Sequence, residues 1–254
     1  MAALWLPKAF AGMTDRYLRI VKTYQLCYNA DKSRNITGGH MATTLIIVRH
    51  GESEANGSKR FAGHLDIPLS AKGFKQAELT AGYIKENYHV DAVYASDLQR
   101  AYHTALPIAE AFDLEVTKTE QLREVFAGHW QGQSFDVLET QYAQSYWTWR
   151  NDIGNGHPEG GESVAEVFQR VWDAVSEIVQ KEDGKTVVIA THATPIRALL
   201  CRVAGWELAK MKDIGWVSNS SVSIVRVEDG KWSLEEKSYD AHLADIKSYF
   251  PANV

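Results

Sequence analysis

Two histidines and two arginines in this sequence are of the residue types that phosphoryl-group chemistry requires, and each lies in a short polar run. His50 follows Arg49 in the run Arg49-His50-Gly51, and Arg100 and His192 stand in short polar runs farther along the chain. A guanidinium group can hold two phosphate oxygens at once, and an imidazole can be a nucleophile towards phosphorus or a proton carrier. Because each short run could also occur by chance, the interpretation depends on the coincidence of all four residues.

The four residues come after three predicted strands, with Arg100 one turn into the helix that follows its strand. Residues 44–48 and 186–190 are continuous, β-branched runs typical of strands buried on both faces of a parallel sheet, and residues 90–95 form a further strand. Ligands bind beyond the C-terminal ends of such strands. We therefore expect the four side chains to converge at one sheet edge, beside helix N-termini that favour an anion.

Helical patterns alternate with these strands, and a weak strand is expected at 114–117. The alternation predicts an α/β fold, a three-layer sandwich with a mostly parallel central sheet and helices on both faces. Helices are predicted over residues 72–88, from a capping box at Ser96 to about 112, near 134–144, over 162–181, and from about 195 to 203. Residues 221–227 and 231–239 should close the fold as a hairpin, and residues 51–71 should be a loop.

The first predicted helix, 72–88, has an apolar period that indicates its packed face. The side chains expected there are Phe74, Ala77, Leu79, Ala81 and Ile84. A second apolar group, in the irregular segment 126–161, could cover a ligand as a lid or simply pack beneath a long loop. Its members are Trp130, Phe135, Tyr142, Tyr146, Trp147 and Trp149.

The first forty residues differ from the rest in charge. Residues 1–40 carry six basic and two acidic residues, whereas the remainder carries 21 and 30. A targeting peptide, a cloning remnant and a start codon placed too early are all open, and Pro7 and Lys8 argue against a secretory signal. We interpret 1–42 as an N-terminal extension that is non-native, mis-started or disordered, and 43–254 as one domain.

Composition excludes several classes of protein. Apolar residues make up 45% of the 254 residues and charged residues 23%, which is typical of a globular chain. No run approaches the roughly 20 apolar residues of a membrane-spanning helix, and a net charge of −5 argues against nucleic-acid binding. The two cysteines, Cys27 and Cys201, exclude a disulfide scaffold or a Cys-rich zinc site and favour the cytoplasm.

The ordered motifs of the chain resemble those of the histidine phosphatase superfamily, the phosphoglycerate-mutase-like proteins. The resemblance covers 43–254 and none of 1–40. The motifs lie at residues 45–56, 66–73, 96–101, 122–124, 128–132, 160–163 and 191–197.

The resemblance implies a role for each candidate site residue. His50 would be the nucleophile that becomes phosphohistidine, and Glu124 the acid that protonates the leaving oxygen and then the base that activates water. The expected phosphate-binding residues, His192 also being expected to be catalytic, are Arg49, Asn56, Arg100, His192, Gly63 and Ala193. Arginines and imidazoles supply the positive charge, so no metal and no cofactor is expected.

Three functions remain open on this basis. The leading hypothesis is metal-independent hydrolysis of a small phosphomonoester, because Phe135 stands where the family's mutases have a lysine and only Arg150 remains of their paired arginines. A cofactor-dependent phosphoglycerate mutase and a catalytically idle phospho-ligand-binding module are the alternatives. We expect a small-molecule substrate and no nucleic-acid or membrane partner. A homodimer stays open.

Overall fold

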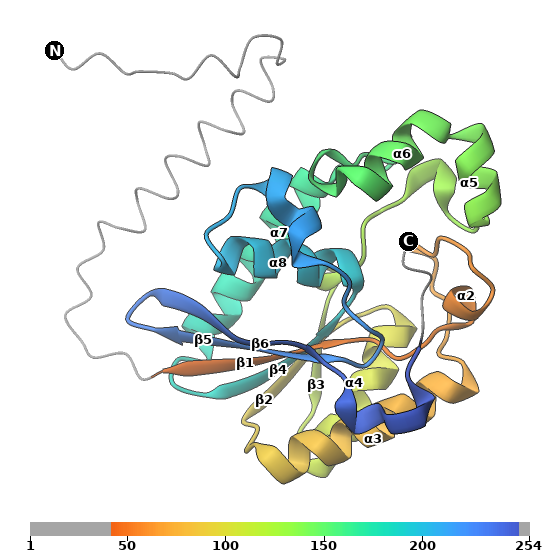
Figure 1. Ribbon diagram of the computed structural model, residues 1–254. Coiled ribbons are helices and arrows are strands. Elements are labelled where there is room, and N and C mark those ends of the chain that lie inside the picture. Colours follow the sequence, from red (N-terminus) through yellow and green to blue (C-terminus); the bar gives the residue numbers. More distant parts are fainter. Residues whose placement is uncertain (1–41, 249–254) are drawn as a thin grey trace, which may run out of the picture. The chain divides into compact units, whose positions relative to one another are not determined.

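A six-stranded, mostly parallel sheet lies at the centre of the fold, as predicted (Figure 1). The computed structural model describes residues 42–248, so the expectation for residues 1–41 lies outside the described residues. The strand order is β3-β2-β4-β1-β5-β6, in which β5 and β6 are antiparallel to their neighbours. The strands are β1 (Thr43–Arg49), β2 (Ala92–Ser96), β3 (Val116–Thr119), β4 (Thr186–Thr191), β5 (Val222–Glu228) and β6 (Lys231–Tyr239).

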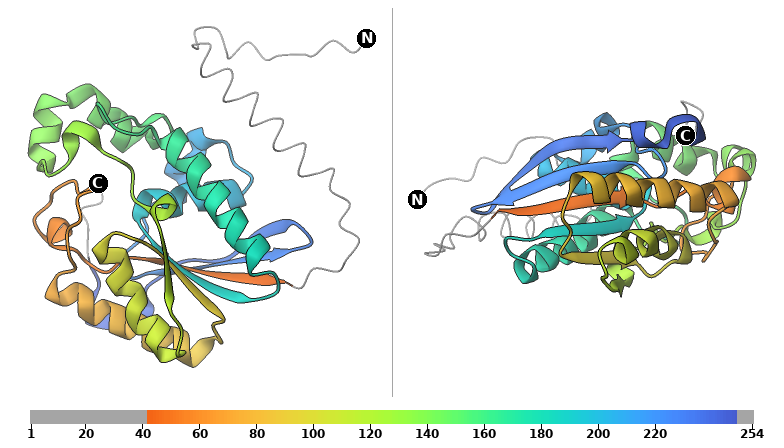
Figure 2. Two further views of the ribbon diagram at one scale, coloured as in Figure 1. Left: turned by 180° about the vertical axis from the view of Figure 1, so that it is seen from behind. Right: turned by 90° about the horizontal axis from the view of Figure 1, so that it is seen from below.

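Helices cover both faces of this sheet, which gives the three layers. α3 and α4 lie on one face, and α7 and α8 lie on the other (Figures 1 and 2). The α-helices are α2 (Glu54–Gly57), α3 (Ala71–Asn87), α4 (Gln99–Ala111), α5 (Phe135–Gln141), α6 (Ala143–Asn151), α7 (Val164–Lys181) and α8 (Ala193–Val203). Short 3-10 helices are η2 (Glu120–Leu122), η3 (Gly128–Trp130), η4 (Ile153–Asn155), η5 (Leu208–Ile214) and η6 (Ala241–Ile246).

Strand β1 is buried on both faces, as its continuous apolar run predicts. Leu45, Ile46, Ile47 and Val48 are all 0% exposed. Ile46 and Val48 belong to the core cluster that contains residues of α3 and α4. Successive side chains of a strand point to opposite faces, so Leu45 and Ile47 point to the layer of α7 and α8.

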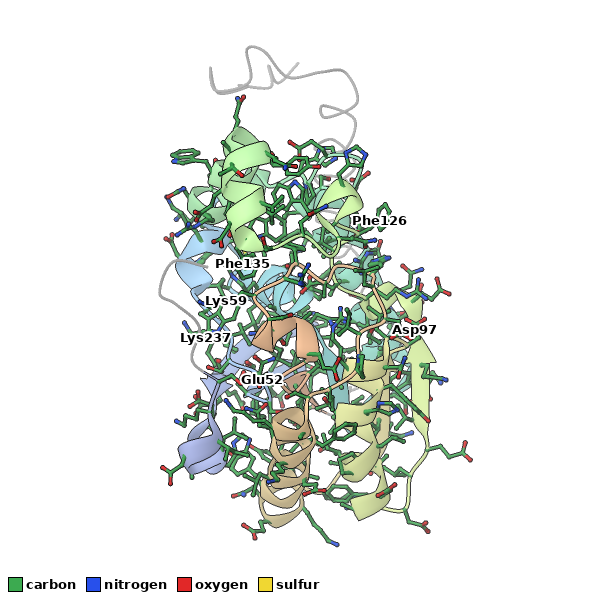
Figure 3. The ribbon with its side chains drawn as sticks, turned by 90° about the vertical axis from the view of Figure 1, so that its right-hand side faces the viewer. Glu52, Lys59, Asp97, Phe126, Phe135 and Lys237 are labelled. Carbon is green, nitrogen blue, oxygen red and sulfur yellow. The ribbon has the colours of Figure 1, made fainter. Side chains whose placement is uncertain are left out.

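The register of the sheet brings the predicted strand ends to one edge. Arg49 pairs with Thr191 across β1 and β4, and Ala95 pairs with Ala190 across β2 and β4. Because β5 runs antiparallel to β1, the residues that precede β5 lie at this edge too. Figure 3 shows the side chains of this end of the molecule, with Glu52 after β1 and Asp97 after β2.

The predicted packed face of helix α3 is partly wrong. Ala77, Ala81 and Ile84 are buried, but Phe74 and Leu79 are 44% and 43% exposed. Polar Gln76 and Thr80 take the buried positions in their place. The side chain of Gln76 forms hydrogen bonds with the backbone of Glu52 and Ile246, and the hydroxyl of Thr80 donates to the carbonyl of Ser220. These hydrogen bonds compensate for the desolvation of both side chains.

The predicted capping box at Ser96 is also wrong. Helix α4 has Leu98 as its N-cap residue, with no side-chain cap. The carboxylate of Asp66, from the loop before α3, accepts the backbone N–H of Gln99 at 2.7 Å instead. The Ser96 hydroxyl contacts the His192 ring at 2.9 Å. A residue that matched a local capping pattern therefore serves a contact across the sheet.

Two further segments differ from their predicted form. The helix expected near 134–144 is two helices, α5 and α6, which meet at Tyr142. The loop expected over 51–71 contains the short helix α2, capped by Ser53. The final hairpin agrees with prediction, since Asp229 and Gly230 both have positive φ, as a tight turn between β5 and β6 requires.

The loop after β1 rests directly on the first turn of α3. A Cβ atom at Gly73 would lie 2.0 Å from the carbonyl oxygen of Glu52, and one at Gly51 would lie 2.5 Å from that of Gly73. The Glu52 carbonyl also accepts the N–H of Ser70, whose side chain caps the same turn. This backbone contact fixes the position of the loop that carries His50 relative to the first turn of α3.

We predict opposite effects for two glycine-to-alanine changes in α3. Gly73→Ala should lower the free energy of unfolding by about 1–3 kcal/mol, because backbone must move to admit the methyl group. Gly82→Ala, where nothing lies within 4 Å of the added Cβ, should raise it by about 0.5–1 kcal/mol through helix propensity. Urea unfolding of both variants measures this, and equal gains in stability would contradict the close contact.

Candidate active site

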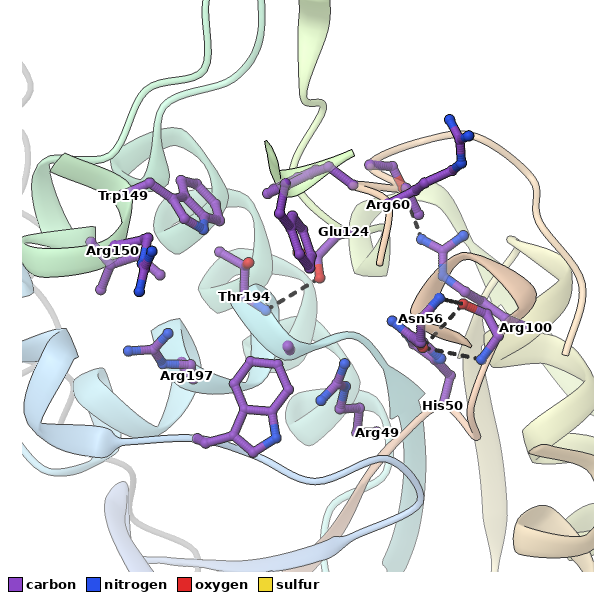
Figure 4. A pocket seen from close by; sticks show the side chains of 18 of the residues that line it. Arg49, His50, Asn56, Arg60, Arg100, Glu124, Trp149, Arg150, Thr194 and Arg197 are labelled. Carbon is purple, nitrogen blue, oxygen red and sulfur yellow. Dashed lines mark hydrogen bonds between the residues drawn. The ribbon is translucent and has the colours of Figure 1, made fainter. Parts of the chain in front are cut away.

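The structure brings the two predicted histidines together at the sheet edge. The ring centroids of His50, after β1, and His192, after β4, are 5.0 Å apart. Arg100, in the first turn of α4, donates from Nε to Nδ1 of His192 at 3.2 Å. The convergence expected from the strand ends is therefore present. A pocket opens beside these residues, and Figure 4 shows the side chains that line it.

His50 is held in one tautomer by its own loop. Nδ1 lies 2.7 Å from the carbonyl oxygen of Gly51, which can only accept, so Nδ1 carries the proton and Nε2 carries the lone pair. The residue is 4% exposed and lines the pocket. Burial, and then repulsion by Arg100 and Arg49, hold the pKa of His50 well below its usual value. His50 is thus a neutral base at physiological pH.

Arg49 and Arg100 place two buried guanidinium groups against the pocket. Arg49 is 3% exposed, donates to the carbonyl of Val217 at 2.5 Å and lies over the ring of Trp216. Arg100 is 1% exposed and donates to the carbonyls of Leu65 and Gly63, each at 2.8 Å.

Both arginines keep their charge despite this burial. Desolvation lowers the pKa of Arg49 to about 9 and that of Arg100 to about 10, while the charge of Glu124 acts in the opposite direction. Both groups are therefore cationic at neutral pH. Because an uncompensated buried charge is costly, this arrangement favours the binding of an anion.

His192 stands behind the pocket wall. It is fully buried, and its two ring nitrogens contact Arg100 and the hydroxyl of Ser96. It is absent from the pocket lining, whereas Ala193, the next residue, does line it. His192 orients Arg100 in this structure, and its expected contact with phosphate stays a prediction. Helix α8 begins at Ala193, so the N-terminal end of that helix meets the pocket.

Glu124 lies in the pocket wall on a tightly held loop. Its carboxylate accepts from the backbone N–H of Val125 at 2.9 Å and is 3.4 Å from that of Thr194. Arg170, on α7, donates to the carbonyls of Glu124 and of two preceding residues and forms an ion pair with Glu162. Arg170 was not predicted. Its sequence signal was the motif that contains Glu162, the ion-pair partner of Arg170, which lies eight residues earlier in the chain and just before α7.

Asn56 is oriented by a second asparagine that sequence reasoning missed. The Oδ1 atom of Asn56 accepts from Ser53 and, at 3.3 Å, from Nδ2 of Asn219. Asn219 also donates to the carbonyls of His50 and Gly51 at 3.0 and 3.3 Å. With Oδ1 so occupied, the amide nitrogen of Asn56 remains for a ligand. The signal for Asn219 was its position in the segment that leads into β5, which begins at Val222 and runs antiparallel to β1.

Gly63, the remaining predicted residue, lines the pocket and positions Arg100 through its carbonyl. Its φ of +53° suits glycine, and an added Cβ would lie 2.8 Å from the side chain of Gln131. The loop around it is therefore fixed by both the arginine and the segment that follows Glu124. Arg60, nearby, donates to the carbonyl of Gly132 and also lines the pocket.

The aromatic residues of segment 126–161 divide between the two predicted alternatives, a lid over a ligand and packing beneath a long loop. Phe135, Tyr146 and Trp149 line the pocket, as a cover for a ligand would. Trp130 is 0% exposed and lies in a buried cluster with Tyr146, against which Phe135 and Trp149 pack, whereas Trp147 is 62% exposed. Packing accounts for Trp130, and the pocket-lining position of the other three agrees with the lid alternative.

Among residues 42–248, no group of three or more His, Cys, Asp or Glu side chains is arranged to hold a metal ion. None of the helices within that range is long and apolar enough to span a membrane.

The fold is α/β, and its candidate site has a buried histidine, His50, beside the guanidinium groups of Arg49 and Arg100. Residues 45–240 match the model of the histidine phosphatase superfamily (branch 1), and the chain belongs to that family. The family and its relatives make the protein a hydrolase of phosphomonoesters.

Named relatives cover most of the chain. Phosphoserine phosphatase 1 of Hydrogenobacter thermophilus is 36% identical over 202 residues, which cover 80% of this chain and 95% of that protein. The metal-independent phosphoserine phosphatase of Arabidopsis thaliana is 32% identical, over 80% of this chain and 84% of that protein. A solved mycobacterial glucosyl-3-phosphoglycerate phosphatase with VO3 has a TM-score of 0.73 and 29% identity, covering 78% of this chain and 99% of that chain.

We predict that Asn219→Ala lowers kcat roughly ten- to a hundredfold while KM changes little. The amide holds the backbone of His50 and Gly51, and small displacements of a reacting group cost rate more than binding. Steady-state kinetics and thermal unfolding should be measured beside Asn87→Ala, a surface asparagine. Loss of stability with kcat unchanged would contradict the positioning role.

Proposed function

We propose that the protein hydrolyses a small phosphorylated metabolite without a metal ion, through a phosphohistidine at His50. The observation that carries this proposal is a buried, neutral His50 that shares its pocket with the guanidinium groups of Arg49 and Arg100. The nucleophile and the charges that a phosphoryl group needs are thus already in place. The name of the Arabidopsis relative supports metal independence.

In the first half of the reaction, Nε2 of His50 attacks phosphorus and the bond from phosphorus to the leaving oxygen breaks. Arg49, Arg100, the amide of Asn56 and the backbone N–H of Ala193 would hold the phosphoryl oxygens. Preorganised donors that match the charge on the phosphoryl oxygens in the transition state lower the barrier. The hydrogen bond from Nδ1 to the Gly51 carbonyl stabilises the positive charge that the ring gains.

Glu124 serves both halves of the reaction. As the carboxylic acid it gives its proton to the leaving oxygen, and as the carboxylate it then takes a proton from the attacking water. Water attack breaks the bond from phosphorus to Nε2 and returns inorganic phosphate and neutral His50. The carboxylate of Glu124 accepts from the backbone N–H of Val125, and the carbonyl of Glu124 accepts from Arg170. These contacts support the acid and base role of Glu124, because proton transfer needs a fixed geometry.

One wall of the pocket favours hydrolysis over mutase chemistry. Phe135, which stands where the family's mutases have a lysine, lines the pocket. A mutase must hold its phosphorylated product for a second transfer, and an apolar ring offers that product no charge. The presence of His50, Arg49, Arg100 and Glu124 in one site also favours an active enzyme over an idle binding module.

We further propose that residues 43–254 form the catalytic domain and that the protein works in the cytoplasm. Support for the boundary comes from the family match over residues 45–240. The buried free thiol of Cys201 suits a reducing compartment. A homodimer remains a proposal, which sedimentation of the purified chain would test.

We predict chelator-resistant hydrolysis of phosphomonoesters that depends on His50. His50→Ala should lower kcat/KM roughly a thousandfold or more, because the nucleophile is lost. His89→Ala, a surface histidine, is the matched control and should leave the rate unchanged. Phosphate release would be measured with EDTA present. Equal activity of His50→Ala and the wild type would overturn the assignment, and transfer without phosphate release would favour the mutase.

A further inference from the structure

A histidine outside the pocket contacts the backbone of Glu124. Nε2 of His64 lies 2.7 Å from the carbonyl oxygen of Glu124. The residues on either side of His64, Gly63 and Leu65, offer their carbonyls to Arg100. The residues that line the pocket include Gly63, Arg100 and Glu124 but not His64. His64 therefore links the loop that receives Arg100 to Glu124, and it can influence the pocket only through these neighbours.

The hydrogen bond to Glu124 determines the tautomer of His64. Since a carbonyl oxygen can only accept, Nε2 carries the proton and donates it. Burial is the main cause that lowers the pKa of His64 below its usual value, so the ring is neutral at physiological pH. The ring also packs beside Phe126, with 5.3 Å between the ring centroids. His64 is thus held against the segment of Glu124 by a hydrogen bond and by packing.

The carbonyl of Glu124 receives a second donor from a different element. Nη2 of Arg170, on α7, donates to it at 2.9 Å. A carbonyl oxygen has two lone pairs, so His64 and Arg170 together use its full accepting capacity. The backbone of Glu124 is therefore held by two separate parts of the fold, and loss of His64 would leave one of them.

The backbone of His64 is tied to the same segment. Oε1 of Gln131 accepts from the N–H of His64 at 2.8 Å. The imidazole of His64 reaches the carbonyl of Glu124, and a side chain that follows Glu124 reaches back to His64. These two hydrogen bonds, one in each direction, hold the two segments in one relative position.

The loop that carries His64 is fixed to the first turn of α4. Arg100 donates to carbonyls on both sides of His64, each at 2.8 Å. The Asp66 carboxylate accepts the backbone N–H of Gln99 at 2.7 Å. The loop is therefore a rigid support, and a donor mounted on it can set the position of Glu124 relative to Arg100.

We propose that His64 is a positioning residue for Glu124, whose backbone it holds so that the carboxyl group meets the leaving oxygen of the phosphomonoester. The inference rests on the proposed function, because it takes Glu124 as the acid of the first half of the reaction. His64 lies outside the pocket, so it acts on the geometry of proton transfer and exchanges no proton with the substrate. A small displacement of the acid costs rate, because the two heavy atoms must lie within hydrogen-bond reach.

The leaving group provides a readout that a purely structural role would not change. Phenolate is a strong base and needs a proton from the acid as it leaves, whereas 2,4-dinitrophenolate is a weak base and does not. The value of kcat/KM reports the steps up to release of the leaving group, so the later attack of water does not enter it. Loss of acid positioning should therefore slow hydrolysis of phenyl phosphate and spare that of 2,4-dinitrophenyl phosphate.

Variants of His64 separate the hydrogen-bond donor from the bulk of the side chain. His64→Met and the smaller His64→Ala have no N–H to offer, and His64→Gln retains one that can reach the Glu124 carbonyl. Each of the first two should lower kcat/KM for phenyl phosphate roughly tenfold or more, and that for 2,4-dinitrophenyl phosphate by less than about threefold. His64→Gln should recover most of the loss.

The design includes a control and excludes partial unfolding as a cause. His89→Met, at an exposed histidine, is the matched control and should change neither value. The ratio of the two kcat/KM values on one variant is independent of the fraction of folded protein. A selective loss on phenyl phosphate therefore cannot arise from a lower stability.

Glu124→Gln, which removes the acid itself, distinguishes failure of the inference from failure of the proposed function. It should show the same selective loss on phenyl phosphate, at least as large as that of His64→Met. If it does, equal loss of His64→Met on both substrates, or loss on neither, would overturn the positioning role. Equal values for His64→Met and His64→Gln on phenyl phosphate would do the same. A Glu124→Gln variant without selective loss would overturn the acid assigned in the proposed function.

Discussion

The burial of Arg49 and Arg100 beside His50 is the constraint on which the rest of the site depends. Removing a guanidinium from water costs several kcal/mol, and only good partners compensate for that cost. Carbonyls of the 63–65 loop and of Val217 provide part of the compensation. An anionic ligand would provide more, so the fold holds its positive charge ready for a phosphoryl group.

Burial and the same charges determine the protonation state of His50. They keep the pKa of His50 well below its usual value, so the imidazole is neutral when the substrate arrives. A protonated ring would bind phosphate but could not attack it. In the proposed reaction, one electrostatic arrangement would therefore serve both binding and nucleophilic attack, and His50 would need no separate base.

Much of the fold and of the site could be predicted because parallel strands end at one edge. The apolar runs before Arg49 and before His192 are visible in the sequence. Because the two strands they form are parallel neighbours, the residues that follow them meet at one edge of the sheet. Asn219 escaped prediction because it precedes its strand, and only the antiparallel pairing of β5 with β1 brings it under His50.

Other errors arose where polar groups occupy buried positions. In α3, hydrogen bonds to distant backbone allow Gln76 and Thr80 to take sites that the apolar period gave to Phe74 and Leu79. Ser96 has a capping pattern, yet its hydroxyl contacts His192. In each case the deciding partner lies far away in the sequence, so local propensity could not reveal it.

The central claim is that His50 carries the phosphoryl group during turnover. Its most direct test is to mix the protein with a phosphomonoester, quench within milliseconds under alkaline conditions, in which phosphohistidine survives, and locate the phosphate by peptide mass spectrometry. The account predicts a phosphorylated peptide containing His50 that is absent from His50→Asn. Full turnover with His50 unmodified, or with phosphate on another residue, would contradict it.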